Sequence, residues 1–266
     1  MLETSIFFLI FIFGLIVGSF LNCIIYRLEV GGSFLKGRSY CPNCKHILSW
    51  KDLIPIFSFL ILRGKCRYCQ KPISLQYPLV ELATGILFVS TTYNLQLITL
   101  QHLLIISYQL LVVSCLVIVF VYDLKHYIIP DKIIYPAIGI AFLYQLFRIL
   151  NFGHLNLFRI WDLGFGVLPS LFFLAIIIFS REKWLGFGDF KLAILIGLIL
   201  GWPKILVALF FAFFTGAIVG LILIALAKKT LKSEIPFGPF LVIGTFLATF
   251  FGEKIIDFYL NLFLPR

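Results

Sequence analysis

Long apolar runs recur along nearly the whole chain, each separated from the next by a short polar stretch. A helix needs about 20 apolar residues to cross a bilayer, and on that measure the runs predict eight spans. We expect them at residues 5–26, 77–98, 102–122, 130–150, 163–180, 188–202, 204–227 and 236–262. Backbone inside a membrane must satisfy its own hydrogen bonds, so the pattern predicts an all-α, multi-pass helical bundle in a lipid bilayer.

The composition agrees with a membrane protein. Hydrophobic residues make up 61 % of the chain and charged residues 13 %, with a mean hydropathy of +1.07, which excludes an ordinary soluble domain. The net charge of +10 could suggest a nucleic-acid partner, but its distribution indicates topology instead. Segment 27–75 and the turns near 125, 185 and 230 hold seventeen Lys and Arg, against five elsewhere. The excess of positive charge on the cytoplasmic side then predicts a cytoplasmic position for these turns and outer positions for both termini.

Segment 27–75 is the one sizeable stretch between the expected spans, and it carries four cysteines. Cys41 and Cys44 form one C-x-x-C pair, and Cys66 and Cys69 form a second, with 21 residues between the pairs. Two such pairs supply the four thiolates of a tetrahedral zinc site, and a loop too polar for its own core would gain folding energy from the metal. Two disulfides are the alternative, which a reducing cytoplasm disfavours.

The residues between the two cysteine pairs are unexpectedly apolar. Residues 50–60 read Trp-Lys-Asp-Leu-Ile-Pro-Ile-Phe-Ser-Phe-Leu. Such a segment can lie against the membrane or against the helix bundle, and the sequence leaves both open.

Two aspartates stand at the ends of apolar runs without an evident structural purpose. Asp123 follows the run 103–122, and Asp189 opens the run 189–202 directly after Gly186 and Gly188. A carboxylate at the edge of a membrane span costs free energy, so its presence there indicates a functional role. The glycines before Asp189 have no side chain, so backbone or substrate can approach closely. Asp131 differs, because with Pro130 it forms an ordinary helix start.

Two carboxyl groups that meet can share a proton and hydrolyse a peptide bond with an activated water. Asp123 ends its helix and Asp189 begins one, and the helix dipole favours negative charge at the N-terminal end. On this basis we expect Asp189 to act as the base toward the water and Asp123 to hold the shared proton.

The ordered set of motifs resembles the type IV prepilin peptidases, a family of G-x-G-D intramembrane aspartic proteases. The resemblance rests on Gly-Phe-Gly-Asp at 186–189, on Asp123 with Pro130 and Asp131 behind it, and on both cysteine pairs. It also includes Gly-Ser-Phe-Leu-Asn at 18–22, Tyr-Pro-Leu-Val-Glu at 77–81 and Pro-Phe-Gly-Pro at 236–239, so that it covers nearly the whole chain.

The resemblance implies a bifunctional enzyme of the bacterial inner membrane with catalytic residues Asp123 and Asp189. Its substrates would be type IV prepilin or pseudopilin precursors of pilus or protein-secretion systems. The enzyme would cleave their leader peptide at the cytoplasmic face and then N-methylate the new N-terminal residue with S-adenosylmethionine. Residues 1–98 would form the methyltransferase part and residues 99–266 a six-span peptidase part. No Rossmann-type glycine motif is present, so the expected methyl-donor contacts, Asn22, Arg27 and Glu81, rest on their location alone.

Three other interpretations remain open from the sequence. A proton-coupled transporter would use its acids near the bilayer midplane, whereas these acids lie at helix ends. A non-enzymatic assembly factor would use the zinc loop for docking, which leaves Asp123 and Asp189 unexplained. A peptidase without methyltransferase activity is the third.

Overall fold

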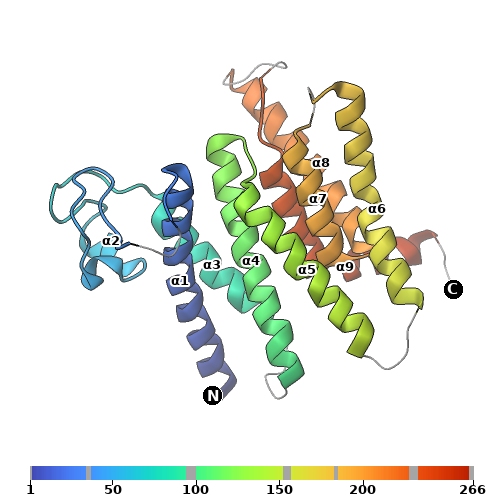
Figure 1. Cartoon of the computed structure of the whole chain (residues 1–266), viewed down its shortest axis with the longest axis horizontal. Helices are drawn as coiled ribbons and strands as arrows, with labels where there is room; N and C mark the ends of the chain where they lie inside the picture. Colours follow the sequence, from blue (N-terminus) through green and yellow to red (C-terminus); the bar gives the residue numbers. More distant parts are fainter. Residues whose placement is uncertain are drawn as a thin grey trace. The chain divides into compact units, whose positions relative to one another are not determined.

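The computed structural model describes residues 2–33, 37–93, 100–151, 157–182, 185–227 and 233–263. Within these ranges the regular structure is helical, apart from two isolated β-bridges in the cysteine loop (Figure 1). Each expected apolar run forms one helix. The eight long helices are α1 (Leu2–Glu29), α3 (Gln76–Thr92), α4 (Leu100–His126), α5 (Asp131–Asn151), α6 (Leu157–Ser180), α7 (Phe187–Leu200), α8 (Lys204–Ala225) and α9 (Gly238–Phe263). Two short elements, η1 (Trp50–Leu53) and α2 (Phe57–Ile61), lie in the cysteine loop.

Five helices in the described part of the chain are long and apolar enough to cross a membrane: α1, α4, α5, α8 and α9. In α6 the apolar stretch is Gly164–Ser180, and α3 and α7 are also short, at 17 and 14 residues. The all-helical membrane fold is therefore confirmed, whereas eight as the number of spans stays a prediction.

The chain divides into two compact units, Met1–Ile118 and Val119–Arg266, with α4 running across the boundary. The first unit contains α1, the cysteine loop and α3, and the second contains α5 to α9 and the last turns of α4. The predicted division of activities between residues 1–98 and 99–266 stays a prediction.

In the first unit, α1 and α3 pack with their backbones in close contact. A Cβ on Gly14 would lie 2.7 Å from the Cα of Gly85, and a Cβ on Gly18 would lie 2.7 Å from the Cα of Glu81. Small residues four apart remove the side chains that would otherwise separate two membrane helices. The glycines of α1 thus bring Glu81 close to the C-terminal half of α1.

In the second unit, α7 is the central helix and packs against α5, α6, α8 and α9. Four of its side chains, Leu192, Ala193, Leu195 and Ile196, are fully buried. Where α7 crosses α6, Gly197 and Gly166 let the two backbones touch. A helix enclosed in this way need not match the bilayer thickness, which accounts for its 14 residues.

We expect Gly18→Ala to destabilise the first unit, because the new methyl group would overlap the backbone at Glu81. Overpacking of this kind costs about 1–3 kcal/mol. Gly139→Ala is the matched control, since a Cβ there meets nothing within 4 Å and alanine is the better helix former. Thermal unfolding in detergent should show a lower midpoint for Gly18→Ala alone; equal midpoints would contradict the close packing.

Candidate active site and metal centre

Asp123 lies in the last turn of α4 and is only 4 % exposed. The helix ends three residues later, where Tyr127 takes a positive φ of 58° and donates its N–H to the Asp123 carbonyl at 2.9 Å. The chain then passes Ile129 and Pro130 and begins α5 at Asp131. The carboxyl group of Asp123 is therefore fixed at a helix end, next to a sharp change of chain direction.

Asp189 lies in the first turn of α7 and is 9 % exposed. Its carboxylate accepts a hydrogen bond from the backbone N–H of Gly186 at 3.2 Å. Gly188 precedes it, and a Cβ there would lie 3.1 Å from the Cβ of Ile129. The two glycines of the Gly-Phe-Gly-Asp motif thus have separate roles. The N–H of Gly186 binds the Asp189 carboxylate, and the missing Cβ of Gly188 leaves room for Ile129 in the segment that follows Asp123.

Gly238, the first residue of α9, is a third glycine at this site. Its backbone N–H donates to the carboxylate of Asp123. A Cβ on Gly238 would lie 2.5 Å from Oδ2 of Asp123 and 3.4 Å from Cδ1 of Ile129. Nothing in the sequence connects the backbone at Gly238 to Asp123, which is 115 residues earlier.

The structure brings the two aspartates together. The two carboxyl groups are close enough to interact electrostatically, and Ile129 lies next to both Gly188, which precedes Asp189, and Gly238, which contacts Asp123. Each carboxylate accepts a backbone N–H near the start of a helix, Asp189 at α7 and Asp123 at α9. Because both carboxylates face the start of a helix, the helix dipole does not distinguish the base from the acid, and the assignment of Asp189 as the base stays a prediction.

Two charged residues near the site, Lys191 and Asp131, pair with each other. Lys191 donates to Oδ1 of Asp131 at 2.6 Å, and its ammonium lies 4.7 Å from the centre of the Tyr135 ring. Asp131 is an acid in the first turn of α5, as predicted, and it also holds this lysine. The lysine nearest to Asp189 in sequence is thus engaged by Asp131.

The four cysteines of the loop form one cluster. The sulfur atoms of Cys41, Cys44, Cys66 and Cys69 all lie within 4.8 Å of one another, and none is in a disulfide. Cys41 and Cys69 from the two different pairs are 3.9 Å apart, close to the roughly 3.8 Å expected between sulfurs that bind zinc at about 2.3 Å. The donor set fits a zinc ion.

The acidity of the thiols also favours a cation. Burial raises the pKa of the Cys41 thiol, but backbone N–H groups of Cys44 and Asn43 outweigh it and bring the pKa to about 7. At Cys69 the N–H of Lys71 lowers the pKa, yet burial and the neighbouring thiols outweigh this and raise it to about 11. A bound cation would stabilise the thiolate form that metal binding needs.

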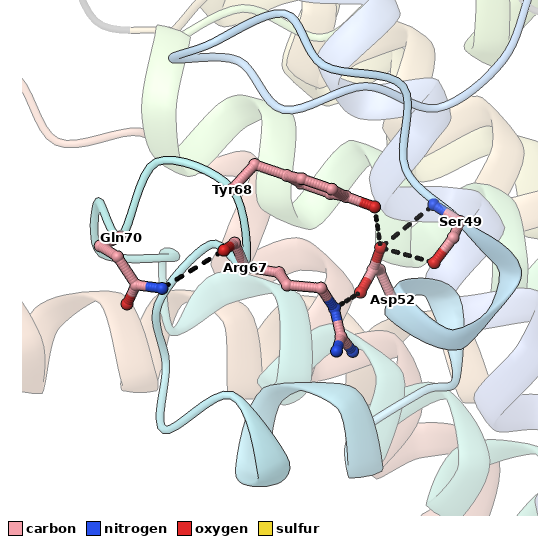
Figure 2. Close-up of polar contacts among 5 residues, drawn as sticks. All are labelled: Ser49, Asp52, Arg67, Tyr68 and Gln70. Atoms are coloured by element: carbon pink, nitrogen blue, oxygen red, sulfur yellow. Dashed lines mark hydrogen bonds and ion pairs between the residues drawn. The ribbon is translucent and has the colours of Figure 1, made fainter.

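Asp52 ties the two cysteine turns together (Figure 2). It accepts hydrogen bonds from Arg67 at 2.7 Å, from the Ser49 hydroxyl at 2.8 Å and from the Tyr68 hydroxyl at 3.2 Å. Burial raises the pKa of Asp52, but these hydrogen bonds outweigh burial and hold it below its ordinary value. The contribution of Asp52 to stability is thus present above its ordinary pKa and lost as the pH falls through the lowered one.

The three expected methyl-donor residues all make contacts that hold the loop. Asn22 donates to the Tyr77 carbonyl at 3.0 Å and accepts from Gln76 at 3.2 Å. Arg27 donates to the carbonyls of Ser33 and Gly37. These contacts position the two ends of the loop, and a part in methyl-donor binding stays a prediction.

Glu81 is buried and accepts the backbone N–H of Ile56 at 2.7 Å and the hydroxyl of Ser19. Ile56 is the centre of a three-residue turn, with φ 61° and ψ −52° and a 2.6 Å hydrogen bond from the Phe57 N–H to the Pro55 carbonyl. This positive-φ γ-turn is strained, above all for a β-branched residue, and needs support from its surroundings. The Glu81 carboxylate gives that support.

Both parts of the chain match known protein families. Residues 12–95 match the bacterial peptidase A24 N-terminal domain, and residues 110–221 match the type IV leader peptidase family. A prepilin leader peptidase/N-methyltransferase from Aeromonas hydrophila is 34 % identical, over 97 % of this chain and 95 % of the relative. The chain belongs to the type IV leader peptidase family.

Other relatives in this family are similar over more than nine tenths of their length. The prepilin leader peptidase/N-methyltransferase of Bacillus subtilis (strain 168) is 32 % identical, over 96 % of this chain and 98 % of its own. The prepilin leader peptidase/N-methyltransferase of Legionella pneumophila is 31 % identical, over 94 % of this chain and 93 % of its own. No solved structure matches the chain significantly. Membership in the family confirms the resemblance of the sequence motifs to the type IV prepilin peptidases.

For this family member we expect about one zinc per chain, measured by elemental analysis of the purified protein. Cys41→Ser with Cys66→Ser should remove the metal and increase hydrogen exchange of the loop amides, because one ligand is lost from each pair. Cys23→Ser is the control, since Cys23 lies in α1 outside the cluster and should keep the metal. Metal-free wild-type protein with two disulfides would contradict the zinc assignment.

Proposed function

We propose that the chain is an intramembrane aspartic endopeptidase that removes the leader peptide of type IV prepilin-like precursors and then N-methylates the new N-terminus. The observation that carries the peptidase activity is the meeting of the buried carboxyl groups of Asp123 and Asp189 at the starts of α7 and α9. The names of the relatives support both activities.

The chemistry follows from two carboxyl groups that share one proton. The ionised carboxylate takes a proton from a water molecule, and the protonated carboxyl donates its hydrogen bond to the carbonyl of the scissile peptide. The resulting tetrahedral species collapses when a proton passes to the leaving nitrogen. Backbone N–H groups of Gly186 and Gly238 hold the two carboxyl groups in place, so little reorganisation is needed during the reaction.

The position of the dyad suits a substrate with an apolar segment. Both aspartates lie in the terminal turns of apolar helices and not in their middles. A precursor helix within the bilayer would present its leader junction at that level, and the excess of basic residues supports a position of this level at the cytoplasmic face of the bacterial inner membrane. The same placement disfavours the transporter, which needs acids near the midplane.

The methyltransferase activity is assigned to the first unit. S-adenosylmethionine, when bound, supplies the methyl group that the freed amine accepts. The zinc-ordered loop, with Asn22, Arg27 and Glu81 at its base, is the part of the unit that can shape a site for both. We therefore expect the cysteine variants to lose methylation more than cleavage.

Asp123→Asn and Asp189→Asn should each abolish cleavage while leaving the protein folded in the membrane. Loss of one acid–base group should slow the reaction roughly 10²–10⁴-fold. The mass of a co-expressed pilin-like precursor gives the readout, since leader removal and one added methyl group are separate mass changes. Asp131→Asn is the control and should cleave normally, because Asp131 pairs with Lys191. Near-normal cleavage by either dyad variant would remove that residue from the site.

Gly238→Ala should impair cleavage without unfolding the protein, because its methyl group would overlap Oδ2 of Asp123. Misplacing a catalytic group by about 1 Å can cost about 10²-fold in rate. Gly252→Ala, in the same helix, is the matched control, since its Cβ would make ordinary contacts with Lys204. Equal single-turnover rates for the two variants would show that Gly238 does not position Asp123.

A further inference from the structure

The segment between the two cysteine turns leaves its apolar side chains exposed. In α2, Phe57, Leu60 and Ile61 stand at i, i+3 and i+4, which places them on one helical face. Trp50 and Leu53 of η1, with Ile54 directly after it, supply three more apolar side chains, and η1 and α2 contact each other. The apolar patch consists of Trp50, Leu53, Ile54, Phe57, Leu60 and Ile61. Trp50 is 71 % exposed and Ile61 75 %, so the described helices of the first unit do not cover the patch.

The depth of this patch is set by Glu81. The Ile56 N–H, one residue before α2, is bonded to the Glu81 carboxylate, and Glu81 lies five residues after the start of α3. Five residues of helix rise about 7.5 Å, which falls in the 5–10 Å range at which interfacial helices bury their apolar face. Figure 1 agrees, since α2 is level with the C-terminal half of α1 and not beyond its end. Leu79 and Leu82 of α3 are exposed at the same level, as expected for side chains that face lipid.

The charges around the patch fit an anionic lipid surface. Lys51 follows Trp50, and Arg63 and Lys65 follow α2, all three exposed. Segment 27–75 as a whole has nine basic residues and two acidic ones. Basic side chains beside exposed Trp, Phe and Leu are typical of segments that lie in the interface of a membrane with negative headgroups.

The patch is also held in a fixed orientation. Asp52 of η1 is bonded to Arg67 and Tyr68 of the second cysteine turn (Figure 2), and the strained turn at Ile56 joins η1 to α2. A preformed patch loses little conformational entropy when it is covered, which favours binding.

We propose that the apolar patch is a membrane anchor: it inserts into the lipid interface beside α1 and α3 and holds the zinc loop flat against the bilayer. This resolves the alternative that the sequence left open, between the membrane and the helix bundle, in favour of lipid. The inference goes beyond the proposed activities and does not depend on them.

The test uses the full-length protein with Trp50 as its only tryptophan, made by Trp161→Phe, Trp184→Phe and Trp202→Phe. The protein is placed in nanodiscs of phosphatidylcholine and phosphatidylglycerol, with and without bromine on the acyl chains. Trp50 should lose most of its fluorescence to brominated lipid and little to aqueous iodide. Quenching by iodide with no effect of brominated lipid would overturn the anchor. The anchor would also be overturned if brominated lipid has no effect and only an added pilin-like precursor protects Trp50 from iodide. The patch would then bind protein and not lipid.

Two paired variants separate insertion from general loosening of the loop. Leu60→Ser with Ile61→Ser, in the single-tryptophan protein, should shift Trp50 from the lipid quencher toward iodide. Asn43→Ser with Lys71→Ser is the matched control at exposed polar positions of the cysteine turns, and it should leave Trp50 in lipid. Equal shifts in both pairs would contradict a role for the apolar side chains themselves.

Discussion

The second unit is built around the burial of two carboxyl groups at the ends of apolar helices. A charge removed from water needs compensation, and here each carboxylate receives a backbone N–H at a helix start, from Gly186 for Asp189 and from Gly238 for Asp123. The same helix starts also need glycine at two positions, because a Cβ at Gly188 would press on Ile129 and one at Gly238 would overlap Asp123. The central α7, which packs against four other helices, carries Asp189 to this position.

The first unit depends on a third buried carboxylate in the same way. Close contact between α1 and α3 at Gly18 places Glu81 beside Ser19, and Glu81 then supports the strained turn at Ile56. The rest of the loop is held by the hydrogen bond of Asp52 with Arg67 and by the cluster of four cysteines. One carboxylate thus connects the membrane helices to a loop that has too small a core to fold by itself. Glu81 thus links the packing of α1 and α3 to the order of the loop and to the position of the apolar patch.

Much of this was predictable from sequence because it rests on local patterns. Each apolar run gave one helix, the C-x-x-C spacing gave one cluster, and helix-end placement identified Asp123 and Asp189. What could not be predicted involves backbone atoms distant in sequence. The contacts of Gly238 with Asp123 and of Ile56 with Glu81 follow no periodic pattern in the sequence. The start of α9, 115 residues after Asp123, also donates to that carboxylate, and the dipole of α4 alone gives no sign of it. Enclosure likewise explains why α7 is shorter than a full span.

The central claim is that Asp123 and Asp189 form one catalytic unit. A double-mutant cycle on cleavage of a pilin-like precursor tests it most directly, with single-turnover rates for wild type, Asp123→Asn, Asp189→Asn and the double variant. Groups that act as a unit are strongly non-additive, so the account predicts that the double variant is no slower than either single variant. Losses that add in free energy, with measurable extra slowing in the double variant, would contradict it.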